Sequence, residues 1–146
     1  MHVSDWMSHP VRSVKPRDNA YHARTLLEEH RLNQLPVVVD GRLVGIVTDR
    51  DLRDAFPSVF DAAANDRASR GARVDPKQVL IENVMSENVL TVLPSQDLAE
   101  AALIMRRERV GALPVVDGHE LLGILTRSDV IDAFLSCEKA AEAAQS

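Results

Sequence analysis

The sequence predicts an α+β protein built from two copies of one strand, helix, hairpin, helix repeat. The chain of 146 residues repeats itself when it is shifted by about 78 positions, so that residues 3–56 lie over residues 81–134 without a gap. About nineteen of about fifty-four aligned residues are identical, against about one in sixteen expected by chance. A chain of this length that is 45% hydrophobic can also bury a core without disulfides or metal. The sequence therefore indicates an internal duplication.

Proline and a helix cap delimit the first two elements of each copy. A short strand is predicted over residues 11–14 and ends at Pro16, which has no N–H to extend a ladder. A helix is predicted from Asn19, and its counterpart Asp97 has Glu100 three residues later, the pattern of a capping box. Apolar residues then follow helical spacing in both copies: Ala23, Leu26, Leu27, Leu98, Ala101, Ala102 and Met105.

A hairpin and a second helix complete each copy. Two β-rich runs, residues 35–39 and 43–47, flank Asp40-Gly41, a strong hairpin signal that Asp117-Gly118 repeats. The last helix of the first copy is predicted to begin at Thr48 and to run past Phe56. In the second copy this helix is predicted to continue into an Ala/Glu-rich tail over residues 138–144.

Each copy has too few strands to cover its own sheet, so we expect the two repeats to pack sheet to sheet. The predicted organisation is a first repeat over residues 1–57, a polar linker over residues 58–78, a second repeat over residues 79–136 and a helical tail over residues 137–146.

Charge and composition exclude several classes of protein. A net charge of −5 argues against general nucleic-acid binding, and no apolar run is long enough to span a membrane. The first residues do not form a signal peptide, and the single cysteine, Cys137, suits a reducing cytoplasm. No nucleophile-with-base pattern appears, and the histidines lack the close pairs of zinc motifs. We therefore expect a cytoplasmic protein with no catalytic residue and no metal site, and not an enzyme.

Three segments of the repeat match a known family. These are Asp5-Trp6-Met7-Ser8, then Leu35-Pro36-Val37-Val38, and a closing Gly-Ile-Val-Thr-Asp-Arg-Asp at residues 45–51. The repeat resembles the CBS domain, and two in tandem resemble a Bateman module, with most similarity to the bacterial acetoin-utilisation CBS group. The resemblance implies a CBS-domain pair in which two β-α-β-β-α repeats are related by pseudo-two-fold symmetry.

The resemblance also implies a ligand. Similar modules bind AMP, ADP, ATP, S-adenosylmethionine or another adenosyl compound in two clefts between the repeats, and hold the ribose with the acid of a Ser/Thr-x-x-Asp segment. Carried over by position, the first cleft uses Ile46, Thr48, Asp51, Val89, Leu90, Val110 and Gly111. The second uses Ile124, Thr126, Asp129, Val11, Arg12, Leu32 and Asn33.

The chemistry of Thr-x-x-Asp supports two roles. An ionised carboxylate only accepts hydrogen bonds, so it suits the paired 2′- and 3′-hydroxyls of ribose. The same spacing, in Thr48-x-x-Asp51 and Thr126-x-x-Asp129, is a Thr N-cap with an acid at N3, and on spacing alone it indicates helix capping. The two roles are compatible, because Thr can cap while Asp turns outward. Three arginines are candidates for a phosphate contact or simply surface charges: Arg12, Arg50 and Arg127.

Two functions follow as hypotheses. The first is a regulatory sensor in which an adenosine-containing ligand shifts the module between two packings that a separate effector protein reads. The alternative is a structural dimerisation module with no bound nucleotide. We expect a homodimer in both cases, with an isologous contact through the final helices. The expected interface residues are Leu52, Phe56, Ile131, Phe134 and Leu135.

Overall fold

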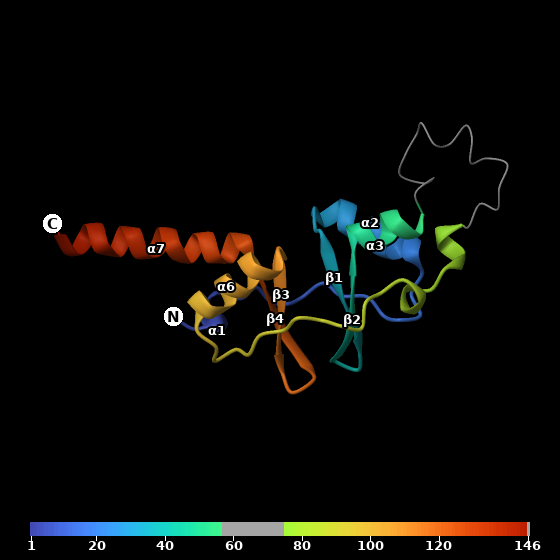
Figure 1. The fold of residues 1–146 in the computed structure, drawn as a ribbon, viewed down its shortest axis with the longest axis horizontal. Coiled ribbons are helices and arrows are strands. Elements are labelled where there is room, and N and C mark those ends of the chain that lie inside the picture. Colours follow the sequence, from blue (N-terminus) through green and yellow to red (C-terminus); the bar gives the residue numbers. More distant parts are fainter. Residues whose placement is uncertain (57–74, 146) are drawn as a thin grey trace. The chain divides into compact units, whose positions relative to one another are not determined.

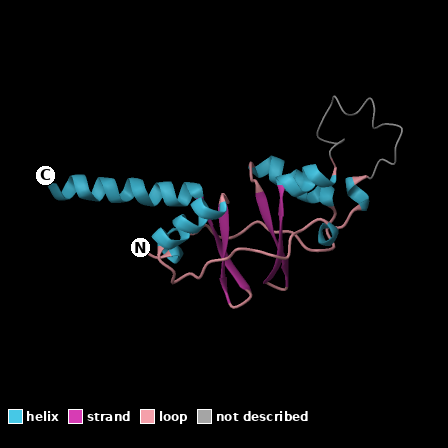
Figure 2. Ribbon diagram, viewed as in Figure 1, coloured by secondary structure: helices cyan, strands magenta, loops and turns pink. Residues whose placement is uncertain are grey.

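A computed structural model describes residues 1–56 and 75–145, which form two compact units (Figure 1). The first unit joins Met1–Val11 to Leu90–Ser146, and the second is Arg12–Val89. Most of the predicted linker, residues 58–74, lies outside the described residues. Each unit is α+β, with helices beside an antiparallel hairpin (Figure 2).

The second unit contains α2 (Ala20–His30), β1 (Gln34–Val39), β2 (Arg42–Thr48), α3 (Asp49–Ala55) and the 3-10 turns η1 (Pro76–Gln78) and η2 (Ile81–Asn83). The side chain of Asn19 accepts the His22 N–H at 2.8 Å, so the predicted cap is confirmed and helix α2 begins at Ala20. The helix ends at His30, and its C-cap Arg31 has a φ of 52°.

The hairpin β1–β2 turns at Asp40 and Gly41, as the sequence predicts. Both residues have positive φ, 50° and 79°, which is the requirement of a type I′ turn and explains a glycine at this position. The strands pair antiparallel, with Leu35 opposite Val47, and both of these side chains are fully buried.

The strand predicted over residues 11–14 is wrong, because only Val14 pairs, as a single parallel bridge to Val37. The Val14 N–H donates to the Pro36 carbonyl at 3.0 Å, and the Val38 N–H donates to the Val14 carbonyl at 2.8 Å. To extend this parallel pairing in either direction, the next hydrogen bonds would need backbone N–H donors at Pro36 and at Pro16. Proline has no N–H, so the pairing stops at one bridge. Val92 makes the same single bridge to Val115 in the other unit.

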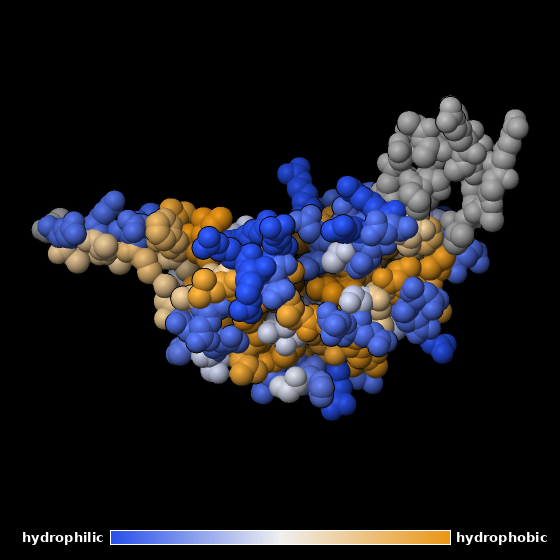
Figure 3. Space-filling view, in the orientation of Figure 1, coloured by the Kyte–Doolittle hydropathy of each residue, from blue (hydrophilic) through white to orange (hydrophobic). Residues whose placement is uncertain are grey.

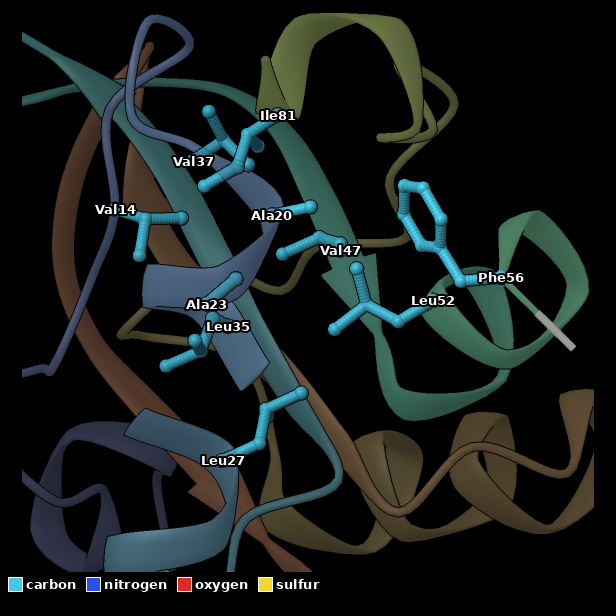
Figure 4. Packing of buried hydrophobic residues seen from close by; sticks show 10 residues of the cluster. All are labelled: Val14, Ala20, Ala23, Leu27, Leu35, Val37, Val47, Leu52, Phe56 and Ile81. Carbon is cyan, nitrogen blue, oxygen red and sulfur yellow. The ribbon is translucent and has the colours of Figure 1, made fainter. Parts of the chain in front are cut away.

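The core of the second unit gathers ten buried residues from its helices, its strands and η2 (Figure 4). Leu52 of helix α3 and Phe56, the residue that follows this helix, are 1% and 5% exposed. The expectation that these two residues form a dimer interface is therefore wrong. The helix also does not run past Phe56, which caps its C-terminus with a φ of −134°. The next residue is Pro57, and the ring of a proline disfavours the helical conformation at the residue before it.

The first unit contains α1 (Val3–Trp6), α6 (Leu98–Glu108), β3 (Ala112–Asp117), β4 (Glu120–Thr126) and α7 (Arg127–Gln145). Asp97 caps α6 through the Ala99 N–H at 3.4 Å, so this cap forms without the expected return bond from Glu100. The predicted tail is helical and continuous with α7 (Figure 1). Among the described residues, no helix is long and apolar enough to cross a membrane.

The second hairpin turns one residue later than Asp117-Gly118. Asp117 is the last residue of β3 and pairs with Glu120, so the turn residues are Gly118 and His119. Gly118 has a φ of 62°, whereas His119 is not among the described residues with positive φ. A positive φ at the first turn residue alone is the pattern of a type II′ turn. The duplicated hairpins therefore keep their loop length and differ in turn type.

The two repeats exchange their leading segments. The Val3 N–H donates to the Gln96 carbonyl at 2.9 Å, and the Leu98 N–H donates to the Met1 carbonyl at 2.9 Å, which fixes α1 in the first unit. In the second unit the Ala20 N–H donates to the Val79 carbonyl and the Ile81 N–H to the Asp18 carbonyl, both at 2.8 Å. Each unit therefore contains residues of both sequence repeats.

Candidate functional site

In the second unit, Thr48 and Asp51 form a complete capping box at the start of α3. The Thr48 N–H donates to Asp51 Oδ2 at 2.9 Å, and the Asp51 N–H donates to Thr48 Oγ1 at 3.0 Å. Among residues 1–56 and 75–145, Asp51 Oδ1 has no hydrogen-bond partner. Capping therefore uses one carboxylate oxygen and leaves the other open, which makes the two roles of this motif compatible.

The first unit repeats this box with one addition. The Thr126 N–H donates to Asp129 Oδ2 at 2.8 Å, and the Asp129 N–H donates to Thr126 Oγ1 at 3.3 Å. The Ser8 hydroxyl also donates to Asp129, at 3.1 Å from Oδ1 and 3.4 Å from Oδ2. Both oxygens of Asp129 are therefore engaged.

Two backbone contacts bring other predicted residues to the box of the second unit. The Asp49 N–H donates to the Asn33 carbonyl at 2.9 Å, which places residues 32–33 beside the end of β2. Ile46 and Ser86 exchange both backbone hydrogen bonds, at 2.9 and 2.8 Å, and carry the segment that leads to Val89 to the same strand.

The first unit makes the equivalent contacts. The Arg127 N–H donates to the Gly111 carbonyl at 3.1 Å, and Ile124 exchanges backbone hydrogen bonds with Ser8 at 2.8 and 3.0 Å. The Arg127 guanidinium lies over Gly111, where an added Cβ would be 3.8 Å from its carbon. The positively charged Arg127 therefore lies beside this box, whereas the acidic Asp49 occupies the equivalent position of the second unit.

The predicted site residues are divided between the two units. Leu32 and Asn33 lie in the unit of Asp51, not in that of Asp129, while Val110 and Gly111 lie in the unit of Asp129. The reason is the hairpin, because the residues before each first strand meet the end of their own second strand. Of the remaining predicted residues, the second unit holds Ile46, Thr48, Arg12 and Val89, and the first holds Ile124, Thr126, Val11 and Leu90.

The predicted site residues also differ in burial. Leu32 and Val110 are partly buried and pack against the two hydrophobic cores. Leu90 is 44% exposed, and Arg12 and Arg50 are exposed. The described residues contain no group of three or more His, Cys, Asp or Glu side chains that could hold a metal ion.

Close packing at Gly45 and Gly123 fixes the segments that approach each box. An added Cβ at Gly45 would lie 2.7 Å from Met85 Sδ and 3.0 Å from the Ser86 carbonyl oxygen. At Gly123 the same atom would lie 2.8 Å from Met7 Sδ. The repeated Met-Ser pair thus requires a glycine opposite it on each strand.

Sequence reasoning missed Ser8. The recurrence of Met-Ser at residues 7–8 and 85–86 was visible as part of the duplication. Its proximity to Asp129 was not, because the two residues are 121 positions apart in the chain.

The duplicated unit makes the chain a tandem-repeat α+β protein, and comparison with known sequences places it in a family. The CBS domain profile matches residues 3–58 and 81–136, more than half of the chain, so the protein belongs to the CBS domain family. A CBS domain-containing protein of Dictyostelium discoideum is 38% identical over 111 residues, which are 75% of this chain and 74% of that protein. An inosine-5′-monophosphate dehydrogenase of Korarchaeum cryptofilum is 35% identical over 121 residues, 82% of this chain, but the chain spans only 21% of that enzyme.

Solved structures of CBS pairs share the fold. CBSX2 in complex with AMP is 32% identical with a TM-score of 0.75, covering 94% of this chain and 98% of its own. A putative acetoin utilization protein, AcuB, from Vibrio cholerae is 27% identical with a TM-score of 0.76, covering 97% and 96%. The CBS pair of protein MJ0100, in complex with 5′-methylthioadenosine and S-adenosylmethionine, is 27% identical with a TM-score of 0.69, covering 93% and 97%. The predicted α+β CBS-pair fold and the resemblance to the acetoin-utilisation group are confirmed.

Proposed function

We propose that this protein is a regulatory module that binds an adenosine-containing ligand, namely AMP, ADP, ATP or S-adenosylmethionine, and catalyses no reaction. Asp51 and Asp129 each hold the ribose of one bound ligand through its 2′- and 3′-hydroxyls. Binding shifts the module between two packings, and a separate effector protein reads the change.

The observation that carries this proposal is the open oxygen of Asp51. Thr48 uses only Oδ2 for the helix cap, and no other described residue occupies Oδ1, so Oδ1 can accept a ribose hydroxyl without loss of the cap. Half-buried Ile46 and Val89 on the neighbouring segments supply apolar surface for a base. Two similar CBS pairs bind adenosyl compounds, AMP in CBSX2 and 5′-methylthioadenosine with S-adenosylmethionine in MJ0100, which supports the same ligand class here.

Calorimetric titration with AMP, ATP and S-adenosylmethionine tests the proposal. Asp51→Asn and Asp129→Asn should each weaken binding at their own site about ten- to a hundredfold, because a charge-assisted hydrogen bond worth about 1.5–3 kcal/mol is lost. Asparagine keeps an oxygen that can accept the N-cap N–H, so the fold should survive.

Asp54→Asn and Asp132→Asn are matched controls, since these exposed acids lie three residues further along the same helices. They should remove the same charge and leave affinity unchanged. If wild type binds none of the three ligands at millimolar concentration, the sensor function is wrong. If all four variants weaken binding equally, the effect is one of net charge, and the ribose assignment is wrong.

The alternative function, a dimerisation module, is favoured by the surface of α7. Ile131, Phe134 and Leu135 are 57%, 60% and 50% exposed, and hydrophobic side chains are visible on this helix in Figure 3. We propose that these three residues form an isologous contact between two copies. Light scattering at micromolar concentration should then give twice the 16.1 kDa mass of one chain, and Phe134→Ser should reduce it to that of the monomer. A monomeric wild type would exclude this alternative.

A further inference from the structure

The two Thr-x-x-Asp boxes differ in one contact. Asp129 accepts the Ser8 hydroxyl at 3.1 Å, whereas Asp51 Oδ1 has no partner among the described residues. Ser86 occupies the position equivalent to Ser8, and its backbone pairs with Ile46 as that of Ser8 pairs with Ile124. The backbone pairing at this serine is thus the same in the two units, and the two serine side chains make different contacts.

A proline explains the difference. Ser86 Oγ accepts the N–H of Asn88, two residues further on, at 3.3 Å. The residue two positions after Ser8 is Pro10, which has no N–H to donate. Ser8 lacks this local donor, and its hydroxyl donates to Asp129 instead.

We infer that the two ribose sites are unequal, with Asp51 the site occupied first and Ser8 an internal competitor at Asp129. This inference rests on the proposed function. The Ser8 hydroxyl makes with Asp129 the same kind of bond that a ribose hydroxyl would make, so a ligand gains less there than at a carboxylate whose oxygen is open. Ser8 is therefore a residue that sets the order of binding.

Adenosine is the probe for the test, because it carries base and ribose but no phosphate to respond to nearby arginines. Asp51→Asn and Asp129→Asn backgrounds isolate the sites. Adenosine should bind Asp51→Asn about three- to tenfold more weakly than Asp129→Asn. The reason is that a ribose hydroxyl must replace the hydrogen bond from Ser8 at Asp129, whereas it adds a hydrogen bond at Asp51. Ser8→Ala should restore about this factor in the Asp51→Asn background and change nothing in the Asp129→Asn background.

Three controls separate competition from a structural effect. Ser8→Thr keeps the hydroxyl and should give no gain. Ser86→Ala, the equivalent substitution in the second unit, should leave adenosine affinity unchanged in both backgrounds, because this side chain makes no hydrogen bond to Asp51. With 2′,3′-dideoxyadenosine, which lacks both hydroxyls, the gain from Ser8→Ala should vanish, whereas a change in fold would affect both ligands.

The possible results distinguish this inference from the function on which it rests. Adenosine and AMP binding to none of the variants or the wild type would overturn both. Equal adenosine affinity at the two sites, or no gain from Ser8→Ala, would overturn the unequal-site inference and leave the sensor function standing. Thermal unfolding of each variant verifies that the compared proteins are folded.

Discussion

Phe56 and Phe134 occupy equivalent positions of the duplication but opposite environments. Phe56 is 5% exposed in the core of the second unit (Figure 4), and Phe134 is 60% exposed on α7. A phenylalanine buries roughly 200 Å² when fully covered, so the two differ by about 110 Å² of apolar contact. At about 25 cal/mol per Å² this is roughly 2.5–3 kcal/mol of stability.

The same substitution should therefore have very different effects. Phe56→Ala also leaves a cavity, and we expect it to lower the free energy of unfolding by about 3–5 kcal/mol. Phe134→Ala should cost about 1 kcal/mol or less. Urea denaturation followed by circular dichroism measures both, at micromolar protein concentration.

Equal losses of unfolding free energy for the two substitutions would refute this reasoning, because they would mean that Phe134 is as buried as Phe56. A repeat at tenfold higher protein concentration adds a second readout. If Phe134→Ala becomes more costly as the concentration rises, a second copy covers this side chain, in agreement with the proposed α7 contact.

Three further predictions concern packing, capping and the surface of α7. Gly45→Ala should lower stability by about 1–3 kcal/mol, because its Cβ would collide with Met85, and Met85→Ala in the same chain should recover part of the loss in urea denaturation. Asn19→Ala should cost about 1 kcal/mol through the lost cap of α2, whereas Asn19→Asp should be nearly neutral in the same assay. Ile131→Lys and Leu135→Lys should leave the unfolding midpoint of dilute protein nearly unchanged but lower the mass seen by light scattering, whereas a loss of stability in dilute protein would show that these side chains are buried within one chain.

Local signals in the sequence predicted the elements well. Helix α2 begins after Asn19, the first hairpin turns at Asp40-Gly41, and Thr48 caps α3, because each depends on residues within four positions of one another. The strand over residues 11–14 failed, because its length depends on Pro36 in a neighbouring strand. The local sequence pattern around residues 11–14 does not show that the strand it pairs with contains a proline at the next hydrogen-bonding position.

The candidate site was predictable in its residue types and less so in its grouping. Both Thr-x-x-Asp boxes form as the spacing indicates, but the motif did not show that Asn33 and Gly111 each contact the start of the helix that follows their own hairpin. Hairpin register decides this, and the register follows from pairing that the motif itself does not encode. The Ser8 contact to Asp129 needed the exchange of leading segments, which arises only in three dimensions.

The exchange of leading segments has a consequence for the order in which the chain can acquire its structure during synthesis. Residues 12–89 are continuous, so once Val89 has left the ribosome the second unit has all its parts. Residues 1–11 emerge before the second unit but hydrogen-bond to residues 94–98, and helix α7 follows later still. Because contacts so distant in sequence are slow to close, residues 1–11 should remain unpaired until residues 94–98 have been made. Residues 1–11 are thus made before the second unit and ordered after it.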